Sequence, residues 1–313
     1  MKVLVSGVGG FIGSHVARRF LADGHEVIGI DDFSGGYRHN VPVGVRLIEG
    51  DLSRSSTISA VPPGSEIILH LAGQSSGEIS FDDPIADLNK NVVSTLNLIR
   101  YGIENDSARI VYASSMSAYG DTGDAPIAED ARCSPLSCYG VGKLAAEGYL
   151  RIYSHRLPFV ALRMFNVYGP GQDMLNLRQG MVSIFLAQAL AGKRVHVKGS
   201  LQRFRDFIYI GDVVEAWSRA ATTPAAANET FNVGTGIRTT VSALLEAMRV
   251  QIPGMEWFVE GSTPGDQTGI YADTAKMRQV LEFNRLTPLS EGMAHFVRWA
   301  QEHIPGSAGL RSP

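Results

Sequence analysis

Short runs of apolar and β-branched residues alternate with helical patterns along the first half of the chain. The runs have the length and composition of buried strands, and they lie at 2–6, 26–30, 45–50, 66–73 and 109–115. A helical pattern follows the first run, and apolar residues recur at helical spacing from Pro84 to Tyr101. Strands that alternate with helices predict an α/β fold with a doubly wound parallel sheet.

The second half of the chain predicts a smaller α/β domain. We expect a helix at 181–191 and an edge strand at 195–197, whereas the strand patterns at 207–210 and 231–233 are expected to return to the first domain. The tail after Ile304 is rich in Pro, Gly and Ser and is expected to be disordered. The expected organisation is therefore a first domain of 1–166 and 206–236, a smaller substrate domain of 167–205 and 237–304, and a disordered tail at 305–313.

The composition is that of an ordinary globular protein. The 313 residues carry a net charge of −3 and are 44% hydrophobic, so we expect neither a nucleic-acid surface nor a membrane partner. No apolar run reaches the ~18 residues that a membrane span needs. Cys133 and Cys138 supply no disulfide framework, and the N-terminus lacks the features of a signal peptide. We expect a cytoplasmic protein without a metal site.

A glycine-rich turn follows the first strand. Gly7 is expected to make the turn, Gly10 to let the backbone reach a pyrophosphate, and Gly13 to let the next helix pack closely on the strand. The unpaired N–H groups of that helix N-terminus would face the phosphates. Asp31, at the end of the next strand, is placed to accept ribose hydroxyls and to repel a 2′-phosphate. These features predict a Rossmann-type dinucleotide site that prefers NAD to NADP.

Further cofactor contacts are expected at the ends of the following strands. Asp51 is placed to bind the adenine amine, with a solvated acid or helix N-cap as the alternative. Asn91 lies among apolar helical positions and is interpreted as a hydrogen-bond relay or, alternatively, a surface amide. His70 is interpreted as a packed strand histidine without a catalytic role. The remaining predicted cofactor contacts are Phe11, Ile12, Asp32, Leu52, Leu71, Ala72, Gly73 and Ser114.

The candidate chemistry centres on Tyr139 and Lys143. They are four residues apart at the start of a predicted helix, so both side chains share one face, about 5–6 Å apart at Cβ. An ammonium beside a phenol is expected to lower the phenol pKa and so to create an acid or base that works near neutral pH. The alternative is a tyrosine packed inward and a lysine in water. The strand at 109–115 ends in serine hydroxyls that are expected to complete the site.

These motifs resemble those of the extended short-chain dehydrogenase/reductase family, and within it the NAD-dependent nucleotide-sugar epimerases of the UDP-glucose/UDP-galactose 4-epimerase type. The resemblance spans the chain to about Trp299. It rests on Gly7-x-x-Gly10-Phe11-Ile12-Gly13, Asp31-Asp32-Phe33-Ser34, Gly50-Asp51-Leu52, Ser114-Ser115-x-x-x-Tyr119, Tyr139-Gly140-x-x-Lys143, Arg163-x-Phe165-Asn166, Arg205-Asp206-Phe207 and Phe231-Asn232-Val233-Gly234.

The resemblance implies inversion of C4 of a UDP-hexose through a 4-keto intermediate. Tyr139 would transfer the proton of the C4 hydroxyl, Ser115 would hold that oxygen, and Lys143 would bind the nicotinamide ribose. It also implies that Asn166, Val182, Val197 and Arg205, with Ser115 and Tyr139, contact the UDP-sugar substrate. We further expect a homodimer in which the helices from Pro84 and Tyr139 pair, because Leu88, Val92 and Leu96 are apolar.

Several departures from the family's motifs bear on the substrate. Met116-Ser117 stands where 4,6-dehydratases carry Asp-Glu, and Gln172-Asp173 where glucuronate-type epimerases carry an arginine, so a neutral hexose is expected. Near Gly265-Asp266, Thr263 replaces an arginine that contacts the diphosphate, and Arg238 is a candidate substitute. Ile270 is smaller than the tyrosine often found at its position, which keeps N-acetyl sugars as candidates. The alternatives are a nucleotide-sugar 4,6-dehydratase or 4-reductase and, more remotely, a non-catalytic dinucleotide sensor.

Overall fold

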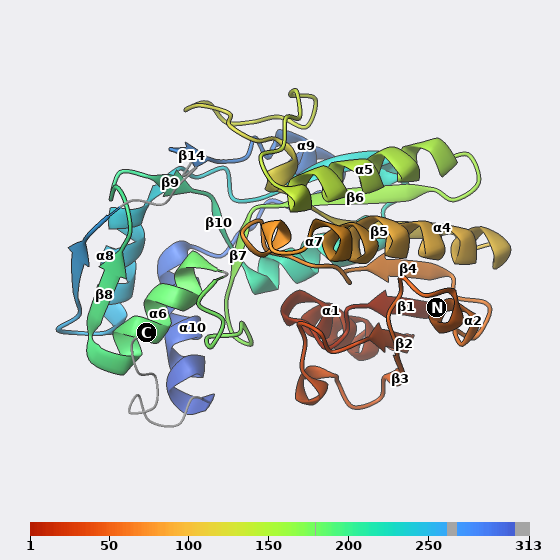
Figure 1. Cartoon of the computed structure of the whole chain (residues 1–313), viewed down its shortest axis with the longest axis horizontal. Helices are drawn as coiled ribbons and strands as arrows, with labels where there is room; N and C mark the ends of the chain where they lie inside the picture. The colour runs from red at the N-terminus through yellow and green to blue at the C-terminus, as the bar shows by residue number, and fades with distance from the viewer. Residues whose placement is uncertain (179, 262–267, 304–313) are drawn as a thin grey trace.

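The computed structural model describes the chain except residues 179, 262–267 and 304–313, so the expected tail and the Thr263–Asp266 motif lie outside the described residues. A seven-stranded sheet in the order β11-β6-β5-β4-β1-β2-β3 forms the centre of the larger part (Figure 1). All of its neighbouring strands are parallel. The strands are β1 (Lys2–Ser6), β2 (Glu26–Asp31), β3 (Arg46–Glu49), β4 (Ile67–His70), β5 (Arg109–Ser115), β6 (Phe159–Met164) and β11 (Glu229–Val233). This confirms the predicted doubly wound sheet, whose strand order reverses between β1 and β4, the place where such sheets bind ligands.

Helices cover both faces of this sheet. One face is covered by α1 (Phe11–Ala22), α7 (Ile210–Thr222) and α9 (Ala275–Val280), and the other by α2 (Ser55–Ser59), α4 (Ser94–Glu104) and α5 (Cys138–Tyr153). The helix expected from Pro84 is present as α3 (Pro84–Leu88), a π-helical turn at Asn89–Val93, and α4, with no break between them. Such turns insert one extra residue into a helix and are frequent at functional sites.

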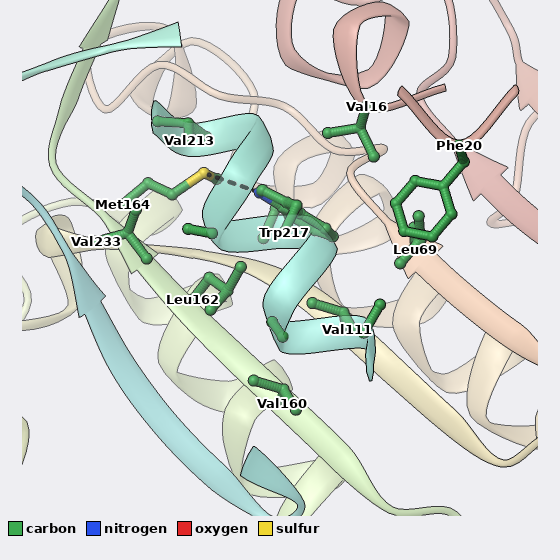
Figure 2. Packing of buried hydrophobic residues seen from close by; sticks show 14 of the residues in the cluster. Val16, Phe20, Leu69, Val111, Val160, Leu162, Met164, Val213, Trp217 and Val233 are labelled. Carbon is green, nitrogen blue, oxygen red and sulfur yellow. Dashed lines mark hydrogen bonds between the residues drawn. The ribbon is translucent and has the colours of Figure 1, made fainter. Parts of the chain in front are cut away.

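The core on the α7 face is organised around Trp217. Its indole is fully buried against the β-branched and leucine side chains of β5 and β6, among them Val111, Val160 and Leu162 (Figure 2). The indole N–H donates to Met164 Sδ at 3.5 Å. The consecutive apolar residues of these strands are thus explained by burial on both faces of the sheet.

A second core lies beyond the carboxyl ends of the strands. It is formed by α6 (Met181–Gly192), β8 (Arg194–Val197), α8 (Val241–Gln251), β13 (Glu256–Val259) and α10 (Leu289–His303). Small strands connect it to the first core: β7 (Asn166–Tyr168) pairs with β10 (Phe207–Tyr209), and β9 (Phe204–Arg205) lies between β12 (Thr239–Thr240) and β14 (Gly269–Ile270).

Both strands that were expected to return to the first domain contact it. β11 joins the large sheet beside β6, and β10 pairs with β7 outside that sheet but places Ile208 in the first core. One segment differs from the sequence-based expectation. Met277, Leu281 and Phe283 pack in the first core, although they fall in the 237–304 segment, because α9 lies against β11. Over the described residues, no helix combines the length and the apolar character required to cross a membrane.

Candidate active site

The structure brings Ser115, Tyr139 and Lys143 together at the carboxyl end of the sheet. Ser115 is the last residue of β5, and Tyr139 and Lys143 lie on consecutive turns of α5. All three are buried. The Ser115 hydroxyl interacts with the Tyr139 phenol, and Lys143 Nζ lies 5.5 Å from the centre of the Tyr139 ring. The Ser137 hydroxyl accepts the Gly140 N–H at 3.1 Å and so caps the helix that carries both residues.

The prediction that Lys143 lowers the pKa of the Tyr139 phenol is wrong in direction. Burial raises the pKa of Tyr139 to about 12, although the hydrogen bond with Ser115 opposes the shift. Burial also lowers the pKa of Lys143 to about 8. Sequence spacing places an ammonium beside a phenol but does not show that both groups are removed from water, and desolvation disfavours both charged forms. Tyr139 therefore holds its proton at neutral pH in this form of the protein.

The glycine-rich turn has the geometry of a phosphate-binding loop. Gly7 has φ +72°, and a Cβ on it would lie 2.7 Å from Ala72 N. A Cβ on Gly13 would lie 2.0 Å from Gly7 O, so the helix can approach β1 only with glycine there. Gly10 is the N-cap residue of α1 and forms no side-chain cap. The N–H groups of the first turn, which begins with Phe11 and Ile12, are therefore available to a ligand. This cradle fits a dinucleotide pyrophosphate.

The acids predicted to bind adenosine lie together. The Asp31 carboxylate accepts the Gly9 and Phe33 N–H groups, each at 2.8 Å, which ties the glycine-rich turn to the end of β2. Lys90, which sequence reasoning missed, pairs with Asp32 and, at 3.0 Å, with Asp51.

Leu52 lies beside Asp51, and its carbonyl accepts the Asn97 Nδ2–H at 2.8 Å. Although burial of the Asp32 carboxylate opposes the shift, the Lys90 ammonium and the Ser34 hydrogen bonds lower the pKa of Asp32.

A directed chain of hydrogen bonds supports the turn after β4. Ser6 Oγ accepts the N–H groups of Leu71 and Ala72 at 3.0 and 3.1 Å, so its own proton goes to His70 Nδ1 at 2.8 Å. His70 therefore carries its proton on Nε2 and donates it to Thr95 Oγ1 at 2.9 Å. Burial lowers the pKa of His70 to about 3, which keeps the ring neutral. The interpretation of His70 as a packed histidine is confirmed.

Asn91 is buried, which excludes the alternative of a surface amide. Its Nδ2 donates to Asp87 Oδ1 at 3.1 Å, while its Oδ1 has no partner in the described structure. A Cβ on Gly73 would lie 2.5 Å from that Oδ1 and 3.3 Å from Lys143 Nζ. A buried acceptor without a donor, beside the predicted catalytic lysine, fits a hydroxyl or amide of a bound cofactor.

Ser114 points away from the predicted cofactor. Its hydroxyl donates to Glu147, which also forms a two-point ion pair with Arg163 at 2.9 and 2.7 Å. This polar network lies between α5 and β6, and its members are buried. Only the backbone of Ser114 remains available for the cofactor contact predicted for it.

A small cavity of ≈ 160 Å³ is lined by Met116, Ser117, Leu136, Ser137 and Ile270, and none of the residues predicted to contact substrate belongs to this lining. Asn166 adjoins it, with its Nδ2 donating to Met116 Sδ at 3.5 Å and to Asp206 O at 3.2 Å. Arg205 donates to Phe204 O at 2.7 Å, and the Arg238 guanidinium lies 3.9 Å from the centre of the Phe204 ring.

Two further predicted contacts are core residues. Val182 and Val197 are buried in the second core, so only their backbone can meet a ligand. Asp206 is also buried, and its carboxylate accepts from Thr235 and Gly236. Among the described residues, no group of histidine, cysteine or acidic side chains has the arrangement of a metal site.

The segment 173–178 connects the two parts of the molecule across the end of the sheet. The Tyr37 hydroxyl donates to Asp173 Oδ2 at 2.9 Å, and Arg178 pairs with Glu78 at 2.9 Å and with Asp82 at 2.8 Å. Tyr37 follows β2, whereas Glu78 and Asp82 follow β4. The segment is therefore held on both sides of the β1 turn that carries the glycines.

Comparison with known proteins agrees with this geometry. The sequence model of the NAD dependent epimerase/dehydratase family matches residues 3–234. The UDP-glucose 4-epimerase of Mycolicibacterium smegmatis is 35% identical over 96% of this chain and 98% of its own length. Two solved structures are each 31% identical and align with 97% of this chain and 100% of their own. They are a UDP-glucose 4-epimerase of Thermotoga maritima with UDP-glucose, at a TM-score of 0.92, and one of Thermus thermophilus complexed with NAD, at a TM-score of 0.88.

Proposed function

Because the chain belongs to the NAD dependent epimerase/dehydratase family, we propose that it is an NAD-dependent isomerase that inverts C4 of a UDP-hexose through a 4-keto intermediate. The observation that carries the proposal is the convergence of Ser115, Tyr139 and Lys143 beside the glycine-rich turn, in a chain whose relatives include UDP-glucose 4-epimerases. The candidate substrates are UDP-glucose and UDP-galactose, with their N-acetyl forms as further candidates.

In this proposal, the chain's own residues bind the cofactor and move one proton. NAD bound in the cradle of the glycine-rich turn would supply the reversible hydride chemistry at C4 of the sugar. Gly7, Gly10 and Gly13 make room for its pyrophosphate, Asp31 accepts its adenosine ribose hydroxyls, and Lys143 binds its nicotinamide ribose.

Tyr139 removes the proton of the C4 hydroxyl while Ser115 holds the oxygen. The phenol pKa of about 12 must fall for this step, and the positive charges of Lys143 and of an oxidised nicotinamide both favour the phenolate. The substrate part of the site is formed by Asn166, Arg205 and the backbone at Val182 and Val197. The residues 167–205 and 237–304 would act mainly as the substrate domain.

The proposal is tested by incubating the purified protein with a panel of UDP-hexoses and UDP-N-acetylhexosamines and resolving the epimers. We expect interconversion of UDP-glucose and UDP-galactose, NAD retained through purification, and no net reduction of added cofactor. The cavity beside Ile270 is small, and turnover of the N-acetyl substrates will show whether it admits the larger substituent.

Other outcomes of this assay favour the alternatives. A 6-deoxy-4-keto product would indicate a dehydratase and overturn the interpretation of Met116 and Ser117. Net reduction of added NAD, with oxidation of the sugar to its 4-keto form, would indicate a reductase working in reverse. Binding of UDP-sugars without turnover of any of them would indicate a sensor.

We also propose a cytoplasmic homodimer formed through α3 and α5. Cys133 and Cys138 are unpaired thiols, as expected in a reducing compartment. Ile85, Leu88 and Val141 are 67, 46 and 55% exposed, and they adjoin an apolar hollow of ≈ 460 Å³ between the two helices. Val92 is buried in the monomer, so the apolar dimer face differs from the one predicted from Leu88, Val92 and Leu96.

Val141→Glu is expected to convert this dimer to monomers, because a carboxylate would lose its water at the centre of an apolar interface. Light scattering at micromolar protein concentration measures the mass. Val250→Glu, at a 74% exposed position on α8, is the matched control and should stay dimeric. A monomeric wild type, or a dimeric Val141→Glu variant, would reject this interface.

A further inference from the structure

Asp87 is a buried carboxylate that no step of the proposed mechanism uses. It lies on α3 and is only 2% exposed. Its Oδ1 accepts hydrogen bonds from Gln74 Nε2 at 2.9 Å and from Asn91 Nδ2 at 3.1 Å. Within the described part of the chain it forms no ion pair within 4.0 Å. A buried charge without a close counter-ion is costly, so its retention calls for a physical reason.

The position of Asp87 relates it to Lys143. Its Oδ2 lies 3.4 Å from the place of a Cβ on Gly142, so the carboxylate packs against α5 one residue before the lysine. Asn91, held by Asp87 through Nδ2, turns its unpartnered Oδ1 toward Gly73 and the Lys143 ammonium. Asp87 thus contacts the lysine's own helix and orients the amide beside the lysine nitrogen.

The titratable groups around Asp87 come from three elements. Tyr139 and Lys143 on α5 face Asp87, and so does Tyr112 on β5. His70 on β4 faces Lys143. The Lys143 ammonium lies 5.0 Å from the centre of the Tyr112 ring. His70 is held neutral, and burial raises the pKa of Tyr112, so neither ring is charged at neutral pH.

We propose that Asp87 is a positioning residue of the active site, whose carboxylate orients the Asn91 amide and balances the charge of the Lys143 ammonium. Burial raises the pKa of Asp87, whereas both of its hydrogen bonds come from N–H donors, which favour the ionised carboxylate and oppose that shift. Burial is the larger influence on Lys143 and lowers its pKa to about 8, whereas the Asp87 charge acts in the opposite direction. The same charge adds to burial in raising the pKa of Tyr139.

The proposal predicts a shift of the whole pH window of activity; this prediction rests on the proposed function. The working form has Tyr139 deprotonated and Lys143 protonated, so activity falls below the phenol pKa and above the ammonium pKa of the loaded enzyme. A negative Asp87 raises both values. Asp87→Asn keeps an oxygen acceptor for Gln74 and Asn91 but removes the charge, so both limbs of the profile should move to lower pH.

Rates of UDP-hexose interconversion by wild type and D87N across the pH range measure the two limbs. Removal of one unit charge from a site with an effective dielectric constant near 20 predicts a shift of about one pH unit in each limb. Asp83→Asn is the matched control, because Asp83 is an exposed N-cap acid on the same helix and asparagine also caps. Its profile should superimpose on that of the wild type. The proposal would be overturned if both limbs of the D87N pH profile lay at the same pH as those of the wild type, or if D87N lost the same fraction of its rate at every pH.

A second readout does not depend on activity. The 13Cε resonance of Lys143, identified as the one missing from Lys143→Met, should titrate near pH 8 in the wild type and at lower pH in D87N. An unchanged midpoint would overturn the Asp87 proposal even in an active enzyme, whereas a shifted midpoint would support it even if no UDP-hexose were turned over. Asp87→Glu restores the charge and should return the midpoint toward that of the wild type, which separates charge from loss of packing.

Discussion

Tyr139→Phe is expected to lower the rate of UDP-hexose interconversion by about 10²–10⁴-fold, the usual contribution of a positioned acid or base. Only the phenol oxygen is removed, and within the described structure the chief interaction that it makes is with the Ser115 hydroxyl. The buried ring stays, so folding and NAD content should be close to those of the wild type. The measurement is the initial rate of epimer formation, with bound NAD determined on the same samples.

Tyr149→Phe is the control for this variant. Tyr149 lies on the same helix and is 38% exposed, so the loss of its hydroxyl should leave the rate unchanged. Turnover of Tyr139→Phe within about tenfold of the wild type would reject general acid–base chemistry at this residue.

Arg163→Met is expected to lower the free energy of unfolding by about 3–5 kcal/mol, the cost of leaving one member of a buried ion pair alone. The side chains of Arg163 and Glu147 are 4 and 2% exposed, and the guanidinium also donates to Glu129 O at 3.0 Å. Although burial opposes the shift, the interaction with Glu147 raises the pKa of Arg163, so the guanidinium is charged under all conditions of interest. Because such a loss is a large part of the roughly 5–15 kcal/mol typical of a native protein, urea unfolding should show it clearly.

Two comparisons identify the cause of that loss. Arg163→Met/Glu147→Leu removes both charges and should recover part of the stability, because no unpaired carboxylate remains in the core. Arg100→Met breaks the exposed pair with Glu104, whose side chains are 58 and 61% exposed, and should cost less than about 1 kcal/mol. A cost this small for Arg163→Met would show that the buried pair contributes little.

The fold was largely predictable from the sequence because the buried strands are apolar along their whole length. The runs at 2–6, 26–30 and 109–115 match β1, β2 and β5 within a residue or two. The π-helical turn at Asn89–Val93 was not predicted, because its extra residue leaves the apolar spacing of the Pro84–Tyr101 pattern recognisable. The pairing of β10 with β7 depends on contacts between distant segments, which a local pattern does not contain.

The candidate site was predicted where a motif fixes both residue type and position. The three glycines, Asp31, Ser115, Tyr139 and Lys143 all lie at one end of the sheet. The direction of the Tyr139 pKa was not predictable, because spacing along a helix carries no information on burial. Asp87 was missed, yet a signal existed: Asp87, Asn91 and Thr95 recur every four residues and form a polar line beside the apolar positions of the helix.

The contacts of the segment 173–178 have a consequence for how long a bound dinucleotide remains in the protein. On the proposed function, we expect a dinucleotide along the ends of β1, β2 and β4 to depart after Asp173 separates from Tyr37 and Arg178 from Glu78 and Asp82. The Arg178 pairs are exposed, and charges in water are screened over about 8 Å at physiological ionic strength. The residence time of the dinucleotide should therefore shorten as salt is added. The rate of epimerisation should stay the same, because Ser115, Tyr139 and Lys143 are buried and shielded from the solvent ions.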